Sequence, residues 1–558
     1  MHMCAEKDDA NTLTISCNDN LEDLRFFRGL AVIDDKLIVG EVGAKQYFIE
    51  HSDEDAIIDA DGRFFAAIKL KDKAVVCVDR FCQDSVFYYS SRGYWAVSNS
   101  LLALTERLFY DNVKVRFNER VLAGHFIAGR GLWGGQGLSL NTMIDGIKVV
   151  PAGSYIEIKE AGGFSILERP AREAALEKSY CELLRDYVFH IRSIVVTLCE
   201  HGYYFNAGLS GGMDSRLNFA MLWPLVKKGF PIKIYTNHNN EEDAKVVFSL
   251  QERLGFELKG YTNNVNVTSG RVAYRNWQLG QMGSYFPISL GLAATPSNPL
   301  FNVHGASFKG VKHRRLAPYT RGRRLAEEMS DPKLGELVRQ EFLSFFEKLG
   351  EDMYARDAMD THYLNTRARY HTGISWYHSL DRARFTPQLF HQYYRLYQLQ
   401  TENGKYNDRL VYDIFQMTVP ELADHEFEVE NKGFSELELV PERNIQPEKD
   451  VSWKVLEFYG KAPVAPNPDE VSRTQDELKE EFTKLLERDV VFYASKLGAQ
   501  DNAYFKRLAD EALDDIEKNK SLIKRQASSL LVAAGRFHEF VDGNQEITFE
   551  ETRASNVR

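Results

Sequence analysis

The chain has 558 residues, of which 44% are hydrophobic and 27% are charged, and its formal net charge is −11. One hydrophobic core does not support this length, so we expect two or three domains of ordinary globular composition. No apolar stretch reaches the roughly 18 residues that cross a bilayer, and the start lacks the apolar core of a signal peptide. The acidic balance disfavours a general nucleic-acid binder. We therefore expect a cytoplasmic protein with no membrane and no nucleic-acid partner.

The cysteines follow no metal-binding or disulfide pattern. There are six of them, without a C-x-x-C pair: Cys4, Cys17, Cys77, Cys82, Cys181 and Cys199. Their neighbours are mostly apolar, so we expect reduced thiols in the core.

The first part of the chain reads as short β-strands. Leu30–Ile33 and Leu37–Val42 flank Asp34-Asp35-Lys36, which is a hairpin signal. Further strands are predicted at Phe64–Leu70, Ala74–Val78, Val86–Tyr89 and Gly93–Ser98, and a helix at Leu101–Arg107. A helix follows in Pro170–Gly202, where apolar residues recur every three or four positions.

A glycine turn then separates a predicted strand from a predicted helix. The apolar run Tyr203–Leu209 ends in Ser210-Gly211-Gly212, and a helix-compatible stretch, Arg216–Leu222, follows. Glycines allow close backbone approach, and the first amides of a helix attract negative charge. A strand, a glycine turn and a helix in this order therefore predict an anion-binding site.

Side chains in the same turn suit a phosphate ligand. Ser210 and Ser215 supply hydroxyl groups, and Asp214 is placed to hold a cation beside the phosphates. The pattern is neither the Walker motif, which requires Gly-Lys-Ser/Thr, nor the G-x-G-x-x-G dinucleotide fingerprint.

The order of elements after this turn predicts a parallel sheet. Ile232–Thr236 reads as a second strand, and Glu241 opens a helix that Gly255 stops. Leu300–Val303 reads as a third, buried strand. Alternating strands and helices imply an α/β fold with helices on both faces of a parallel sheet, and ligands in such folds bind at the carboxyl ends of the strands.

The turn at residues 210–215 resembles the SGGxDS pyrophosphate loop of PP-loop ATP pyrophosphatases, which split ATP into AMP and pyrophosphate while adenylating a substrate. Other segments resemble asparagine synthetases. Those similar to the N-terminal domain of that family are Asp61–Ala67, Asp79–Phe81, Phe87–Tyr89, Ala96–Leu104 and Ile147–Tyr155. The family also includes β-lactam synthetases and lasso-peptide cyclases.

The resemblance implies three domains. Residues 1–168 would form a β-rich domain like an Ntn glutaminase, residues 169–450 a PP-loop synthetase domain (adenine nucleotide α-hydrolase-like), and residues 451–558 a helical C-terminal extension. In the family the glutaminase nucleophile is a cysteine directly after the initiator methionine. Cys4 follows Met3, but polar residues follow it where the family has a glycine and an apolar strand. We therefore expect a degenerate, inactive glutaminase-like scaffold.

The resemblance also implies site residues. Those expected to bind ATP and its pyrophosphate group are Leu209, Ser210, Gly211, Gly212, Asp214, Ser215, Thr236, Asn237, Gly305 and Ser307, with Asp214 also binding Mg²⁺. The segment Gly404–Phe415 resembles the K-x-x-L-R catalytic element, so Lys405, then Arg409, would stabilise developing charge; a solvated charge at a helix start is the alternative for either residue. The loop after residue 303 lacks the family's carboxylates and carries Lys309, a point charge for pyrophosphate; a plain surface loop is the alternative.

These expectations combine into an ATP-dependent amide-forming ligase with ATP and Mg²⁺ as cofactors. Its substrates would be a small-molecule or peptide carboxylate and an amine or ammonia, in a specialised-metabolite or surface-polysaccharide pathway. A homodimer is possible. One alternative is a catalytically inactive nucleotide-binding subunit; another is a different PP-loop chemistry such as tRNA thiolation. The C-terminal stretches Asn467–Lys496 and Asp501–Val541 read as helices, with Leu530–Val541 docked on the body.

Overall fold

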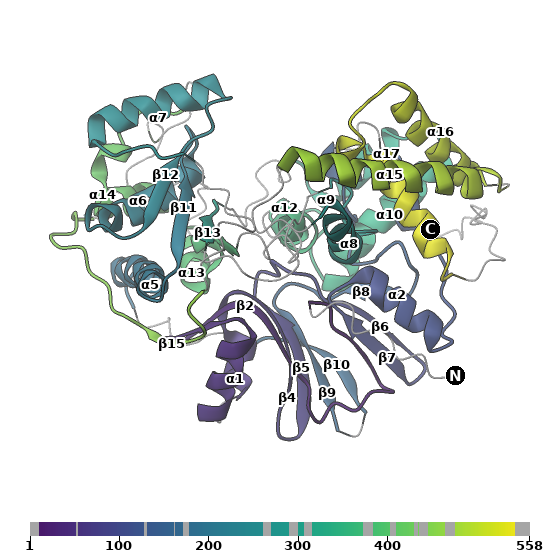
Figure 1. Ribbon diagram of the computed structural model, residues 1–558, viewed down its shortest axis with the longest axis horizontal. Helices are drawn as coiled ribbons and strands as arrows, with labels where there is room; N and C mark the ends of the chain where they lie inside the picture. The colour runs from purple at the N-terminus through teal and green to yellow at the C-terminus, as the bar shows by residue number, and fades with distance from the viewer. Residues whose placement is uncertain are drawn as a thin grey trace.

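The protein is described here by a computed structural model. It describes residues 11–51, 54–127, 131–160, 162–170, 178–260, 269–288, 300–305, 315–371, 383–401, 409–428, 434, 445–463, 475–500 and 502–541. These residues form a mixed α/β structure with three sheets, one of them parallel, which confirms the predicted fold class at this level (Figure 1). Among them, no helix is both long and apolar enough to span a membrane.

The largest sheet has seven strands in the order β10-β9-β5-β4-β2-β3-β15. The strands are β2 (Arg25–Ile33), β3 (Lys36–Val39), β4 (Asp61–Lys69), β5 (Lys73–Val78), β9 (Ser154–Lys159), β10 (Phe164–Glu168) and β15 (Glu457–Tyr459). The predicted hairpin is confirmed, since β2 and β3 pair through Ile33 and Lys36. β3 ends at Val39 rather than Val42 because Gly40, at φ 65°, turns the chain into helix α1 (Gly40–Glu50).

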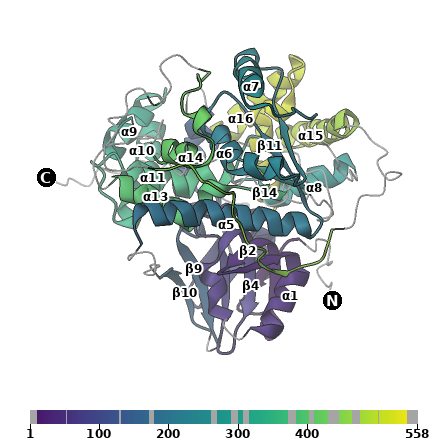
Figure 2. The same ribbon diagram turned by 90° about the vertical axis from the view of Figure 1, so that its left-hand side faces the viewer.

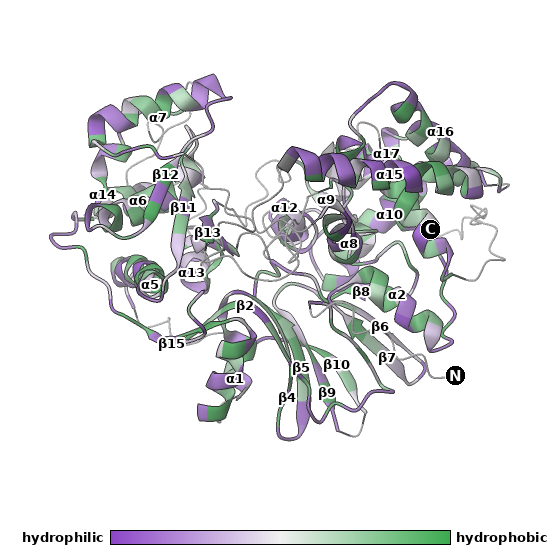
Figure 3. Cartoon of the chain, viewed as in Figure 1, coloured by the Kyte–Doolittle hydropathy of each residue, from purple (hydrophilic) through white to green (hydrophobic). Residues whose placement is uncertain are grey.

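A four-stranded antiparallel sheet packs on this one. Its order is β1-β7-β6-β8, with β1 (Thr14–Ser16), β6 (Phe87–Ser91), β7 (Tyr94–Ser98) and β8 (Ile147–Val149). Successive residues of β4 point to opposite faces, so Phe65 joins the core shared with Trp95 of β7 while Phe64 packs towards Tyr47 of α1. Both faces of the larger sheet are therefore buried, which agrees with the hydrophobic colouring of β4 and β5 in Figure 3.

The parallel sheet has the order β12-β11-β13-β14, and its neighbouring strands pair in parallel. Its strands are β11 (Tyr204–Gly208), β12 (Ile232–Tyr235), β13 (Leu300–Val303) and β14 (Ala383–Phe385). The helices packed with it are α5 (Tyr180–Glu200), α6 (Met213–Lys227), α7 (Glu241–Leu254), α13 (His391–Thr401) and α14 (Arg409–Thr418). In Figure 2, α5 lies between this sheet and the N-terminal strands, and its core residues share a cluster with Leu30 and Leu37.

Local signals set the helix ends beside this sheet. α5 begins after Ser179, whose hydroxyl and Glu182 form a reciprocal capping box. This start lies inside the predicted range 170–202, of which residues 171–177 are outside the described part. α7 ends at Gly255 in the left-handed conformation, φ 69°, as predicted.

The remaining helices form a third group, on the right in Figure 1. They are α2 (Leu101–Tyr110), α3 (Glu119–Gly124), α4 (Gly131–Gly134), α8 (Gly270–Gly280), α9 (Pro318–Glu327), α10 (Pro332–Leu349), α11 (Ala358–Tyr363), α12 (Arg369–His371), α15 (Gln475–Gly498), α16 (Ala503–Glu517) and α17 (Gln526–His538). The predicted C-terminal helices are confirmed for the described residues, whereas residues 467–474 and 501 of the predicted stretches lie outside them. Residues 518–525 interrupt the second stretch between α16 and α17. Leu530 and Leu531 are buried, so α17 docks on the body as expected.

One strand departs from the predicted helical extension. β15, at residues 457–459, pairs with β3 at the edge of the N-terminal sheet. The division into 1–168, 169–450 and 451–558 stays a prediction, but the third segment contributes both a strand and helices to separate parts of the molecule.

Candidate functional site

Several of the predicted site residues lie where the parallel strands end. Gly208, the last residue of β11, lies opposite Tyr235, the last residue of β12. The Leu209 N–H then donates to the Tyr235 carbonyl oxygen at 2.8 Å, and Leu209 is buried. Because neighbouring parallel strands end at the same edge, Thr236 and Gly305 follow at the same side of the sheet.

Hydrogen bonds inside the turn fix its shape. The Ser210 N–H donates to Ser215 Oγ at 3.0 Å, and the Gly212 N–H donates to Ser210 Oγ at 3.2 Å. The two serine hydroxyl oxygens are 2.9 Å apart. Gly212 is the N-cap of α6, so the turn delivers its amides directly to a helix N-terminus.

The Gly211 amide donates to a carboxylate. Its N–H bonds to Oδ1 of Asp243 at 2.8 Å, and Asp243 belongs to the first turn of α7. The other carboxylate oxygen, Oδ2, accepts from Asn240 Nδ2 at 2.6 Å. A negatively charged acceptor at this amide occupies the kind of position that a phosphate oxygen takes at a helix N-terminus.

Gly305, two residues after β13, touches the turn that follows β11. Asp214, in the first turn of α6, is exposed, and Gly305 packs against its backbone. A Cβ atom on Gly305 would lie 2.7 Å from Asp214 Cβ and 3.1 Å from the Asp214 carbonyl carbon. Only glycine fits there without displacement, so the two predicted phosphate loops adjoin through Asp214 and Gly305.

Arg216 fastens a distant segment to the turn. Its buried guanidinium donates to the carbonyl oxygens of Gly211 at 3.2 Å and His425 at 3.1 Å, and also to the carbonyl of Glu426. The same group lies over the Phe427 ring, 4.0 Å from its centroid. Burial lowers the pKa of Arg216 to about 10, against the opposing effect of nearby carboxylates.

The end of that segment covers the glycines. The Glu428 N–H donates to the Gly211 carbonyl oxygen at 3.4 Å. A Cβ atom on Gly211 would lie 2.6 Å from Glu428 Cβ, and one on Gly212 would lie 3.8 Å from Glu428 Oε1. Asp214, Asp243 and Glu428 therefore surround the turn with carboxylates.

Two of these groups are of the chemical type that binds Mg²⁺ or a polar ligand atom. Carboxylate oxygens such as those of Asp214 are the ligands that Mg²⁺ prefers. Thr236 Oγ1, directly after β12, is buried without a hydrogen-bond partner among the described residues, so it can accept a polar ligand group. Asn237 is exposed, and its Oδ1 accepts from the Asn239 N–H at 3.1 Å.

Of the predicted catalytic cations, the described residues include only Arg409, which pairs with Asp413. Ser307, Lys309 and Lys405 lie outside the described part of the chain. Arg409 is buried in α14, where its Nε donates to Asp413 Oδ1 at 2.7 Å. The hydroxyl of Tyr180 donates to the same carboxylate at 2.8 Å. Arg409 thus has an internal ion-pair role, and its catalytic role stays a prediction.

Three residues of the site were not assigned from sequence. Asp243 had a usable signal, because three acidic residues open the helix after the second predicted strand. The sequence around Arg216 indicates only the start of a helix. Glu428 had no local signal, because its contact with Gly211 joins segments more than 200 residues apart.

Comparison with models of known protein families and with curated proteins gives no match for this chain.

Proposed function

We propose that this chain is an ATP-dependent carboxylate–amine ligase, similar to the asparagine synthetases. The observation that carries the proposal is the turn at residues 210–215. It ends a central strand of a parallel sheet, opens a helix, and donates its Gly211 amide to a carboxylate. An anion at that position, beside the exposed Asp214, matches what the pyrophosphate group of Mg-ATP requires.

Most of the predicted binding residues have a part in this proposal. The amides and hydroxyls of Ser210, Gly211, Gly212 and Ser215 hold the pyrophosphate group. Asp214 holds Mg²⁺, which supplies positive charge against the phosphates. Thr236 and Asn237, after β12, line the position for the adenine. Lys405, Arg409 and Lys309 remain the proposed sources of positive charge for the reaction.

Asp243 competes with the ligand in this scheme. It accepts the Gly211 N–H that a phosphate oxygen would take, so binding of ATP exchanges one anionic acceptor for another. The carboxylates around the turn also repel a bare triphosphate, which makes the Mg²⁺ complex the form that binds.

The proposed reaction has two steps. A carboxylate oxygen of the substrate attacks the α-phosphorus of ATP, and pyrophosphate leaves. An amine or ammonia then attacks the activated carbonyl carbon, loses a proton, and displaces AMP to form the amide. The cytoplasm and a specialised-metabolite or surface-polysaccharide pathway are the setting we propose, with an inactive N-terminal scaffold.

A second candidate is a catalytically inactive nucleotide-binding subunit. The observation that favours it is the coverage of the glycine turn by Asp243 and by Glu428.

Exchange between ATP and radioactive pyrophosphate separates these candidates. The assay is run with Mg²⁺ over a panel of carboxylates that includes sugar acids and peptides, for wild type, Asp214→Ala and the control Asp510→Ala. Asp510 is an exposed aspartate of α16, away from the turn. We expect exchange with one class of carboxylate, lost only in Asp214→Ala.

Calorimetry of ATP binding accompanies the assay. Binding of ATP with no exchange across the whole panel would establish the inactive subunit instead of the ligase. Absence of ATP binding by wild type would overturn both candidates.

A further inference from the structure

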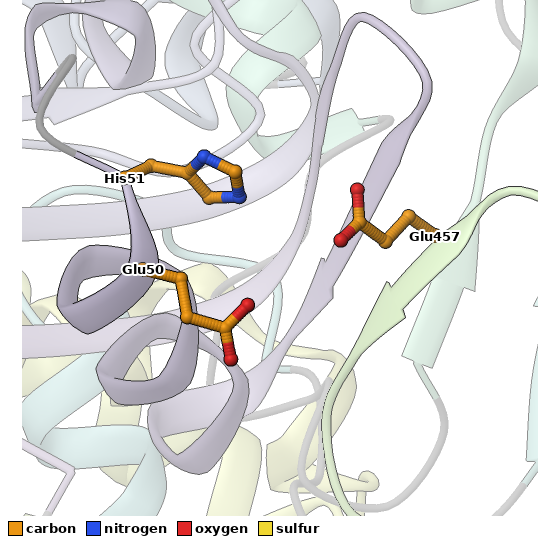
Figure 4. A group of neighbouring side chains, drawn as sticks. All are labelled: Glu50, His51 and Glu457. Atoms are coloured by element: carbon orange, nitrogen blue, oxygen red, sulfur yellow. The ribbon is translucent and has the colours of Figure 1, made fainter.

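A second group of polar side chains lies far from the glycine turn. Glu50 is the last residue of α1, His51 is its C-cap, and Glu457 begins β15. Figure 4 shows the three side chains directed towards a common centre. One potential ligand atom from each lies within 4.8 Å of those of the other two.

The hydroxyl group of a buried tyrosine contacts all three side chains. The Tyr459 side-chain oxygen is 2.8 Å from His51 Nε2, 3.1 Å from Glu50 Oε2 and 2.5 Å from Glu457 Oε1. Tyr459 as a whole is only 4% exposed. The imidazole can donate to the phenol, but the phenol has one proton for two carboxylates.

The cluster therefore has more negative charge than it has protons to share. When the hydroxyl donates to Glu457, an oxygen of Glu50 faces the phenol oxygen at 3.1 Å with no proton between them. A cation among these groups would relieve the repulsion.

The ligand groups are held in place by tight packing. A Cβ atom on Gly43 of α1 would lie 2.2 Å from the Tyr459 carbonyl oxygen, so the helix rests directly on β15. The Tyr47 ring packs edge-on against the Tyr459 ring, with centroids 5.4 Å apart, and lies 4.6 Å from the His51 ring. The Gly460 N–H also donates to Gln46 Oε1 at 3.0 Å.

We propose that Glu50, His51 and Glu457 form a site for a divalent transition-metal ion of the Zn²⁺ class, with Tyr459 as a positioning residue. One imidazole nitrogen and two carboxylate oxygens suit Zn²⁺, whereas Ca²⁺ and Mg²⁺ prefer oxygen ligands alone. Ligand atoms about 2.1 Å from one ion are roughly 3.4 Å apart, so side-chain rotation closes the site. The two carboxylates are exposed, which gives the ion access from solvent.

Such an ion would tie two distant parts of the chain. β15 is the edge strand of the seven-stranded sheet, and it comes from the segment that precedes the C-terminal helices. Metal bound between α1 and β15 would stabilise that strand pairing, because an ion that binds only the folded state adds its binding free energy to stability. The proposal is independent of the nucleotide site.

The test is Zn²⁺ titration of the full chain after treatment with EDTA and dialysis, by calorimetry and by metal analysis after equilibrium dialysis. We expect one Zn²⁺ per chain, bound more tightly than about 10 μM, with a higher melting temperature. His51→Ala and Glu457→Gln should each weaken binding at least about tenfold, and Tyr459→Phe about 10- to 100-fold. Loading with Co²⁺ adds a visible spectrum, which Tyr459→Phe should alter while circular dichroism stays unchanged.

His201→Ala is the matched control. The His201 ring stacks on Phe458 of the same strand, at 3.9 Å, but does not belong to the cluster. It should leave Zn²⁺ affinity unchanged. The proposal would be overturned if wild type did not bind one Zn²⁺ per chain. It would also be overturned if His51→Ala and Glu457→Gln bound Zn²⁺ as tightly as wild type, or if His201→Ala lost as much affinity as those two variants.

Discussion

The seven-stranded sheet and the parallel sheet place their polar side chains in different surroundings. In the seven-stranded sheet, Arg63 of β4 pairs with Asp84 at 3.2 Å, and both are only 6% exposed. At the end of β11, Asp214 is exposed and Asp243 is partly exposed around a turn of glycines. An enclosed ion pair can affect only the stability of the fold, whereas polar groups at open strand ends can exchange partners with a ligand. Substitutions in the two regions should therefore separate stability from binding.

The largest expected effect is on the enclosed pair. Arg63→Met leaves Asp84 buried without its cation, so we expect a loss of about 3–5 kcal/mol in the free energy of unfolding, measured with urea. The double variant Arg63→Met/Asp84→Leu should recover most of that loss, because neither charge of the pair remains. ATP affinity at pH 7 should not change in either variant. A loss below about 1 kcal/mol in Arg63→Met would show that the pair contributes as little as an exposed one.

The next effect concerns an imidazole enclosed by the helices. His362 is buried beside Phe342 and Phe346, its Nε2 is 2.8 Å from the Leu138 carbonyl oxygen, and burial lowers its pKa to about 4. The folded state keeps the ring neutral, whereas the unfolded chain takes up a proton below pH 6.5. This contribution to stability is complete above pH 6.5 and is lost towards pH 4, by about 3 kcal/mol.

Thermal unfolding between pH 4 and 8 measures this dependence. At pH 8 the melting temperature of His362→Phe should be lower than that of wild type, because the variant lacks the hydrogen bond to Leu138. On acidification its melting temperature should fall less than that of wild type. Parallel slopes for the two proteins would contradict the assignment of the proton to His362.

At the glycine turn we expect a substitution to reduce stability less than in the two cases above, and to reduce ATP affinity more. A methyl group on Gly211 meets Glu428 Cβ at 2.6 Å and Asp243 Oδ1 at 3.0 Å, so Gly211→Ala must displace both segments. If the proposed function holds, ATP affinity should fall at least about tenfold, equivalent to about 1.4 kcal/mol. Gly212→Ala is the matched control, since its nearest contacts are 3.3 Å and 3.8 Å away. Equal losses in the two variants would count against the proposed role of the Gly211 amide.

The smallest expected effect is a gain. Asp243→Asn keeps the shape of the acceptor at the Gly211 N–H but removes its charge, so the competing hydrogen bond becomes weaker. We expect Mg-ATP to bind about 3- to 10-fold more tightly, since charged hydrogen bonds exceed neutral ones by roughly 1 kcal/mol. Calorimetry at fixed Mg²⁺ measures the change. Weaker binding would instead assign Asp243 a direct role in holding the metal or the nucleotide.

Much of the architecture around the turn could be predicted from local signals. Strand β11 and helix α6 follow from an apolar run broken by glycines, and α7 ends at the predicted Gly255. Parallel pairing followed from the alternation of strands and helices. Asp243 and Glu428 did not follow from sequence, because hydrogen bonding and packing against Gly211 depend on how α7 and residues 425–428 are folded over the turn.

The cluster at Glu50 illustrates the same limit. Nothing near Glu50 or His51 in the sequence points to Glu457, and β15 lies within a stretch that was expected to be helical. Its placement required the pairing of β15 with β3 and the close contact of Gly43 with Tyr459.

The sequence by itself determined the α/β class, the strand–turn–helix unit at residues 204–227 and the main helix ends, because these depend on residue periodicity, glycine conformation and capping within a few positions. Only the tertiary structure decided which carboxylates surround the turn, that the Tyr180 hydroxyl reaches Asp413, and that β15 joins the N-terminal sheet. Contacts of that kind join residues tens to hundreds of positions apart. They form only when packing of the hydrophobic cores brings those segments together, so local propensity does not predict them.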